Sequence, residues 1–228
     1  MTKENALFGI VGLLIGLIVG FIFANSVNKS AIITSGSGVG LSQSLPANAS
    51  AGQPTANLPE VQAAIEKAKA EPQNFDAQIA AGDLYYKIQR FDGAVELYGR
   101  ANQINPDDYY VMVQLGNANF EVAKYEEAEK WYSKALSKTP DDVNVRTDLG
   151  LTFMFRQPAD YDRAIREFKR SLEYQPDHPQ TLQNLTVAYT KKMDAANARA
   201  TLAKLESKEP SNAAIAKLRT DIEKLGTR

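Results

Sequence analysis

Few side chains in this 228-residue sequence could carry catalytic or metal chemistry. There is no cysteine, which excludes disulfides, thiolate metal sites and a cysteine nucleophile. His178 is the only histidine, and no partner for acid–base catalysis or metal binding can be placed beside it. Because Pro179 follows it, we expect His178 to lie in a surface turn. These absences favour a non-catalytic protein without a cofactor or a metal ion.

Carboxylates recur directly after prolines. They are Asp107 and Asp108, Asp141 and Asp142, and Asp177. Such residues can bind calcium, but their return at one place in a repeated turn favours helix N-caps. The glycine-rich residues 36–40 lack the Lys-Ser/Thr ending of a phosphate-binding loop, so we interpret them as linker. The net charge of −1 argues against nucleic acid as a partner.

Residues 6–24 contain no charged side chain and are rich in Leu, Ile, Val, Phe and Gly. At about 1.5 Å per residue, a helix of this length spans roughly 28 Å, close to the hydrocarbon core of a bilayer. A cleaved signal peptide is the main alternative. Its apolar region is usually shorter and ends in a small-x-small cleavage site, which residues 23–26 match poorly. We therefore predict an uncleaved transmembrane anchor within residues 1–29.

Gly12, Gly16 and Gly20 are four residues apart in this segment, which places them on one helical face. Such a stripe lets another membrane helix approach closely, although glycine is also common in membrane helices in general. A helix–helix contact at these glycines is therefore predicted.

Residues 30–59 carry no charged side chain and consist mainly of Ser, Gly, Ala, Pro, Asn and Gln. This composition predicts a flexible linker, about 30 Å in average span. A tract without Lys or Arg directly after an anchor is easier to translocate than to retain. We expect a single-pass membrane protein with a cytoplasmic N-terminus and a periplasmic remainder.

Prolines recur at a nearly constant interval in residues 60–228. Pro72, Pro106, Pro140, Pro176 and Pro210 are 34, 34, 36 and 34 residues apart. This interval predicts a helical repeat array between two capping helices. The four blocks are residues 75–108, 109–142, 143–178 and 179–212.

Small and aromatic residues recur within the blocks. Glycine occupies the eighth position in three of them, and an alanine followed four residues later by an aromatic residue recurs in the second half. These residues are Gly82, Gly116, Gly150, Ala94, Ala128, Ala164, Tyr98, Tyr132 and Phe168. The spacing puts the side chains on one helical face and lets paired helices approach closely.

This pattern resembles the tetratricopeptide-repeat family over residues 75–212. The resemblance implies an all-α fold, a right-handed helical-repeat solenoid of antiparallel helix pairs. Three departures stand out: Gln78 and Arg146 replace a bulky residue at the fourth position, and Thr186 replaces a glycine. Residues 157–160 lengthen the third block, which predicts a wider turn there.

The resemblance also implies a concave groove lined by the first helix of each repeat. The matching positions are Asp83, Tyr86, Tyr110, Val113, Asn117, Phe120, Glu121, Leu151, Met154, Phe155 and Asn184. The basic clamp with which some members hold a C-terminal carboxylate is absent except for Asn117. Aromatic residues anchor partner segments, amides bond a peptide backbone, and the carboxylates favour a partner with basic residues.

These features predict a membrane-tethered, non-catalytic adaptor that binds a peptide or helical segment of another protein. Assembly of a cell-envelope complex is the narrower expectation. The alternative is a permanent structural subunit of a membrane complex, held through the glycine-striped helix. No small-molecule substrate is expected.

Overall fold

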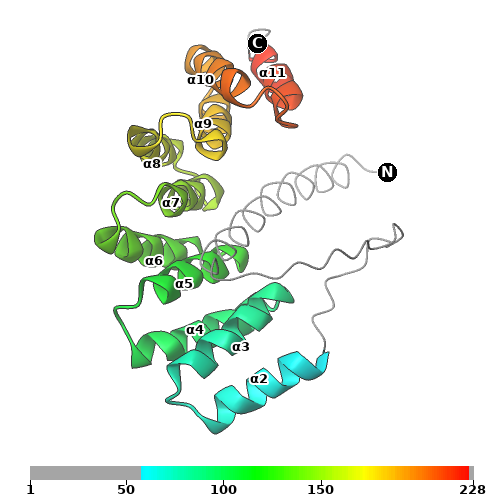
Figure 1. The fold of residues 1–228 in the computed structure, drawn as a ribbon. Coiled ribbons are helices and arrows are strands. Elements are labelled where there is room, and N and C mark those ends of the chain that lie inside the picture. The colour runs from blue at the N-terminus through cyan, green and yellow to red at the C-terminus, as the bar shows by residue number, and fades with distance from the viewer. Residues whose placement is uncertain (1–57, 226–228) are drawn as a thin grey trace, which may run out of the picture. The chain divides into compact units, whose positions relative to one another are not determined.

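The computed structural model describes residues 58–225, which form ten α-helices and no strand (Figure 1). The helices are α2 (Leu58–Ala70), α3 (Phe75–Lys87), α4 (Phe91–Ile104), α5 (Tyr109–Glu121), α6 (Tyr125–Lys138), α7 (Val143–Phe155), α8 (Tyr161–Tyr174), α9 (Pro179–Lys191), α10 (Ala195–Lys208) and α11 (Ile215–Glu223). They pack as the pairs α3–α4, α5–α6, α7–α8 and α9–α10, stacked in chain order. The predicted all-α helical-repeat solenoid is confirmed for this part of the chain.

The predicted anchor, residues 6–24 with Gly12, Gly16 and Gly20, lies outside the described residues, as does nearly all of the predicted linker. Within residues 58–225, no helix has the length and apolar character needed to cross a bilayer.

Glycine lets the two helices of a pair approach closely. A Cβ atom added at Gly116 would lie 2.4 Å from the Tyr132 ring, and one added at Gly150 would lie 2.4 Å from the Phe168 ring. Because both rings are almost fully buried, neither can move aside without disturbing the core. The last pair replaces both members of this contact: Thr186 stands at the glycine position, and Leu202 stands at that of the aromatic ring.

Side-chain acceptors cap five of the ten described helices. Asp108 and Asp142 cap α5 and α7, where each accepts a hydrogen bond from a backbone N–H, as predicted. Asp177 was wrongly predicted as a cap, because the N-cap residue of α9 is His178, whose side chain makes no capping bond. Asp177 directly follows Pro176, whereas the cap is the second residue after the proline in each repeat. For the same reason Asp107 and Asp141 are not caps either. Asp177 instead pairs with Lys208, with 3.3 Å between carboxylate and ammonium.

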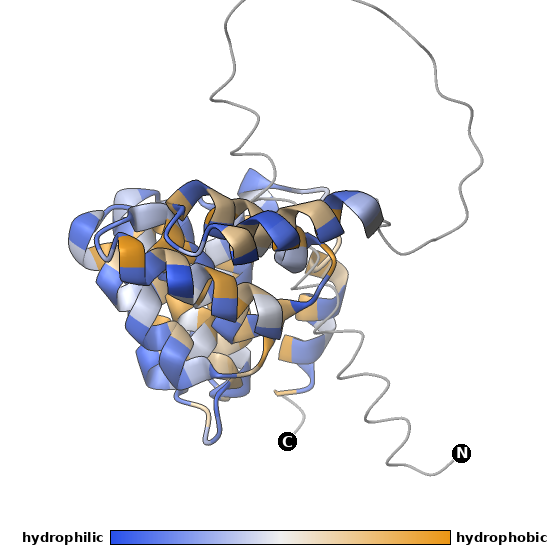
Figure 2. Ribbon diagram, turned by 90° about the horizontal axis from the view of Figure 1, so that it is seen from below, coloured by the Kyte–Doolittle hydropathy of each residue, from blue (hydrophilic) through white to orange (hydrophobic). Residues whose placement is uncertain are grey.

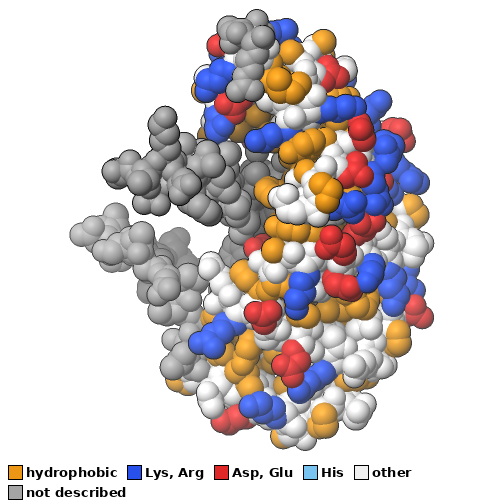
Figure 3. Space-filling view, turned by 180° about the vertical axis from the view of Figure 1, so that it is seen from behind, with side chains coloured by type: hydrophobic (Ala, Val, Ile, Leu, Met, Phe, Trp, Pro, Cys, Tyr) orange, Lys and Arg blue, Asp and Glu red, His pale blue; other side chains and the backbone are white. Residues whose placement is uncertain are grey.

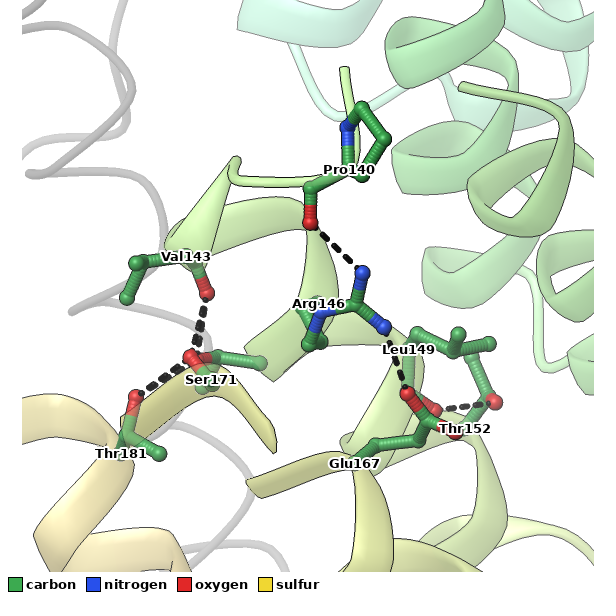
Figure 4. Close-up of polar contacts among 9 residues, drawn as sticks. Pro140, Val143, Arg146, Leu149, Thr152, Glu167, Ser171 and Thr181 are labelled. Carbon is green, nitrogen blue, oxygen red and sulfur yellow. Dashed lines mark hydrogen bonds and ion pairs between the residues drawn. The ribbon is translucent and has the colours of Figure 1, made fainter. Parts of the chain in front are cut away.

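The two polar residues at the fourth position, Gln78 and Arg146, form hydrogen bonds with the chain that precedes their repeats. Gln78 donates through Nε2 to the carbonyl oxygen of Ala68 at 2.7 Å, near the end of α2. Arg146 donates through Nη2 to the Pro140 carbonyl oxygen at 2.7 Å and through Nη1 to Glu167 at 3.0 Å (Figure 4). These bonds satisfy carbonyl groups near helix ends that no helical N–H can reach.

A buried hydroxyl cluster joins the third repeat to the fourth. Thr147 lies 2.6 Å from Thr181 and 3.1 Å from Ser171, measured between side-chain oxygens. Ser171 also donates to the Val143 carbonyl oxygen at 3.0 Å (Figure 4). Buried hydroxyls of this kind require partners, and here they supply them to one another.

The turns within the pairs fall into two types. In three pairs a single residue with positive φ reverses the chain: Gln89, Ala123 and Met193, with φ of 60°, 58° and 66°. In the α7–α8 pair residues 156–160 form a wider turn, as predicted, and Asp160 caps α8.

Both ends of the array are covered. Helix α11 buries Ile215, Leu218 and Ile222 in a cluster with Leu202 and Leu205 of α10. At the other end, Ala68 of α2 packs with Ala81 and Leu97. Hydrophobic and hydrophilic residues alternate along individual helices, as expected where one face of each helix is buried (Figure 2).

Candidate functional site: the first-helix surface

Helices α3, α5, α7 and α9 form one side of the array, here called the first-helix surface. Helix α5 contacts α7, and α7 contacts α9, so successive first helices lie side by side. Six of the predicted groove residues are half-buried on this surface: Asp83, Tyr86, Val113, Glu121, Met154 and Phe155. Tyr110 is 43% exposed, and Asn117, Phe120, Leu151 and Asn184 are buried.

Asp83 is the centre of a tyrosine cluster that joins two repeats. One oxygen of its carboxylate accepts hydrogen bonds from the hydroxyls of Tyr98 and Tyr110, each at 2.7 Å. Burial raises the pKa of Asp83 above its ordinary value of 3.8, and the bonds from the tyrosines offset only part of that rise. The Asp83 charge is thus held by neutral donors rather than by a cation.

The hydrogen bonds continue from Tyr110 along α5. The Tyr110 hydroxyl accepts from Gln114 Nε2 at 2.9 Å, and Gln114 Oε1 accepts from Asn117 Nδ2 at 2.8 Å. Asn117 Oδ1 in turn accepts from the Tyr132 hydroxyl at 2.8 Å. Both polar groups of Asn117 therefore have partners within the protein. Its amide orients the buried ring of Tyr132, a role that repeat spacing alone could not indicate.

An aromatic cluster lies where α5, α6 and α7 meet. The ring centroid of Phe120 is 5.3 Å from that of Tyr125 and 5.7 Å from that of Phe155, both in edge-to-face geometry. The rings of Tyr125 and Phe155 lie 6.3 Å apart and nearly parallel. One repeat earlier, Tyr86 makes an edge-to-face contact with Phe91 at 5.1 Å. Edge-to-face contacts of this kind hold aromatic rings in fixed orientations.

Glu121 lies among these rings at the end of α5. The Tyr86 hydroxyl lies near its carboxylate. Burial raises the pKa of Glu121 above its ordinary value of 4.5, and the nearby Tyr86 hydroxyl opposes the rise. The Glu121 charge also raises the pKa of Tyr125, after the larger effect of that ring's burial. Glu121 therefore links the first aromatic pair to the cluster around Phe120.

Two carboxylates of this surface, Asp83 and Glu121, have no cationic partner among the described residues. Within residues 58–225, neither Asp83 nor Glu121 forms an ion pair with a Lys or Arg side chain. Arg146 is on α7, but its guanidinium is bound to Glu167 and is only 4% exposed. Lys and Arg side chains are frequent elsewhere on the array (Figure 3). The surface is thus aromatic and locally anionic.

Asn184 and His178 lie on α9 and in the turn before it. Asn184 on α9 is buried, and its Nδ2 group has no hydrogen-bond partner. His178 lies in the turn before α9, with Nδ1 2.7 Å from the Thr181 hydroxyl. Within the described residues, no group of three or more His, Asp or Glu side chains is placed to hold a metal ion.

The repeat register seen in the structure agrees with comparisons with known proteins. One sequence profile described as tetratricopeptide repeat matches residues 89–147 and 156–222. A second profile with the same description matches residues 49–109. The chain belongs to the tetratricopeptide-repeat family. A comparison with curated proteins found no match.

Solved structures share this tetratricopeptide-repeat fold. A crystal structure of MamA has 22% sequence identity and a TM-score of 0.61, over 67% of this chain and 88% of that chain. YrrB, described as a TPR protein with an unusual peptide-binding site, has 17% identity and a TM-score of 0.62, over 70% of this chain and 81% of its own. A MamA fragment from Desulfovibrio magneticus RS-1 has 16% identity and a TM-score of 0.61, over 67% and 85%. At these identities the likeness establishes the fold alone.

Proposed function

We propose that this tetratricopeptide-repeat protein is a non-catalytic adaptor that binds a segment of a partner protein on its first-helix surface. One observation carries the proposal: Asp83 and Glu121, on adjacent repeats, have no cationic partner within residues 58–225 and lie beside the partly exposed tyrosines Tyr110 and Tyr86. An uncompensated charge next to apolar rings is suited to a segment that supplies both a cation and apolar side chains. The peptide-binding site named for YrrB supports this use of the fold.

The bound segment is a helix or an extended peptide with apolar and basic residues. Tyr86 and Phe155, both partly exposed on this surface, are the anchors, because large aromatic side chains commonly dominate the binding energy of an interface. Asp83 and Glu121 select for the basic residues. Since attraction between charges is screened by salt, binding weakens modestly as ionic strength rises.

Residues 6–24 tether the adaptor to a membrane as a single-pass anchor, with the repeats in the periplasm, where they serve the assembly of an envelope complex. The apolar length of this segment and the uncharged residues 30–59 behind it support the tether and its orientation. Protease added to cells with a permeabilised outer membrane should digest the repeats. Protection until the inner membrane is lysed would reverse the orientation.

The test of binding is a pull-down from native membranes with the wild-type chain and the Tyr86→Ala/Phe155→Ala variant. Loss of each anchor costs about 2 kcal/mol, roughly a thirtyfold loss of affinity, so a micromolar partner should no longer be retained. Glu127→Gln, which changes an exposed ion pair on α6, is the matched control and should retain the partner. Full retention by a double variant that is folded by circular dichroism would place binding elsewhere.

A further inference from the structure

The array contains an internal example of a carboxylate and an aromatic ring that together hold arginine. Glu129 on α6 pairs with Arg163 at 2.5 Å and with Arg156 at 3.2 Å. Both guanidinium groups lie over the ring of Phe153, with 4.0 Å and 5.4 Å to its centroid. Charge and ring act on the same cations, because the carboxylate pairs with the guanidinium while the ring face attracts it.

A carboxylate and aromatic rings also lie at the end of α5, but no Lys or Arg side chain of the described residues is paired with them. Glu121 supplies the carboxylate. Phe120 precedes it on α5 and contacts the rings of Tyr125 and Phe155, and the Tyr86 hydroxyl lies near the carboxylate; these five residues are called the Glu121 site. Four cation–π contacts occur within residues 58–225, over Trp131, Phe153 and Tyr174, and none involves a ring of the Glu121 site. The Tyr86 hydroxyl near the carboxylate brings no positive charge.

We propose that the Glu121 site binds an arginine side chain of the partner segment, with the guanidinium paired to Glu121 and packed against the aromatic rings. The inference rests on the proposed adaptor function and names the residue that this part of the surface recognises.

The chemistry favours arginine over lysine. The guanidinium is planar, packs on ring faces, is more weakly hydrated than an ammonium group and can donate two parallel hydrogen bonds to a carboxylate. A half-buried site demands partial desolvation of its ligand, which is easier for the guanidinium than for the strongly hydrated ammonium group. Within residues 58–225, arginine makes three of the four cation–π contacts, over Phe153 and Tyr174, and Lys134 over Trp131 makes the fourth.

The probe is the peptide acetyl-Phe-Arg-Phe-amide, compared with versions in which citrulline or lysine replaces arginine. Citrulline keeps the shape and the planar group of arginine but carries no charge. Binding to the full-length chain in a non-ionic detergent is followed by calorimetry. The arginine peptide should bind about tenfold more tightly than the citrulline peptide, and the lysine peptide should lie between them.

Glu121→Gln keeps an oxygen acceptor beside Tyr86 but removes the charge. It should reduce the difference between the arginine and citrulline peptides to less than about twofold, whereas Glu127→Gln should leave it unchanged. Equal binding of the two peptides to the wild-type chain, or an unchanged difference in Glu121→Gln, would overturn the proposal.

The pull-down distinguishes failure of the proposed adaptor function from failure of arginine recognition. If the native partner is captured by the Tyr86→Ala/Phe155→Ala variant, partner binding lies elsewhere, although the wild-type chain can still prefer the arginine peptide. If the native partner is lost from that double variant but fully retained by Glu121→Gln, the adaptor function stands and arginine recognition fails.

Discussion

At the scale of single residues, the glycines between paired helices give a sharp test of packing. Gly116→Ala should destabilise the array by about 1–3 kcal/mol, because the new Cβ would lie 2.4 Å from the buried Tyr132 ring. Gly99→Ala is the matched control: this helical glycine has no atom within 4 Å of an added Cβ, so alanine should stabilise it by roughly 0.5–1 kcal/mol. Urea unfolding of both variants measures the difference, and equal stabilities would contradict the packing.

Glu121 makes the free energy of unfolding depend on pH. Its pKa is raised in the folded protein, so its contribution to stability is present below about pH 4.5 and is lost as pH rises through the folded value. Above that value the protein carries a partly buried charge without a cationic partner. Glu121→Gln should therefore be more stable than wild type at pH 7, and the advantage should shrink in acid.

Urea unfolding at pH 7 and pH 4 tests this prediction, with the exposed Glu127→Gln as control. A Glu121→Gln variant that is less stable than wild type at pH 7 would show that the carboxylate stabilises the free protein. The expected result would mean that the unbound protein gives up stability to keep the charge available for a ligand.

At the scale of helices, Arg146 joins the third repeat to the second. Arg146→Met should cost about 2–3 kcal/mol, because Glu167 and the Pro140 carbonyl would lose their donor at a largely buried position. Arg146→Met/Glu167→Met should recover part of this loss, since a partly buried pair can be replaced by apolar residues more easily than it can be broken. Thermal unfolding of the two variants tests this prediction. A double variant that is less stable than Arg146→Met alone would contradict it.

Helix pairs and their register follow from local rules, which is why the sequence predicts them. The contact between Gly116 and Tyr132 recurs with fixed spacing, and proline marks each boundary. The chain of hydrogen bonds from Tyr110 through Gln114 to Asn117 could not be predicted in the same way. It depends on side-chain orientations and on a hydroxyl from the paired helix, and neither follows a repeat.

The Glu121 site could likewise be predicted from the sequence only in part. The resemblance places Tyr86, Phe120, Glu121 and Phe155 on first helices, but Tyr125 comes from a second helix and was not predicted as a site residue. A recurring aromatic residue at the start of the second helix was the available signal, since Phe91 and Tyr125 occupy the same repeat position. It indicated packing only, because periodicity does not tell which rings remain accessible beside a carboxylate.

At the scale of the whole array, stability is a sum of repeats and of the contacts between neighbours. Helix α11 closes one end through a cluster formed almost entirely with α9 and α10. The Glu121 site lies several helices away, on α3, α5, α6 and α7. An array of this kind should allow one end to open while the other stays folded.

Removal of residues 213–228 tests this independence. The deletion exposes Leu202 and Leu205, which α11 covers, so amide protons of α9 and α10 should lose protection against hydrogen exchange. Helices α3 to α6 should keep most of their protection, because their contacts run to α2 and α7 rather than to α11. The shortened chain should still prefer the arginine peptide over its citrulline counterpart, although the newly exposed leucines should make it prone to aggregation. Equal loss of protection in α3 and α10 would mean that the array unfolds as one cooperative unit, and binding would then depend on its far end.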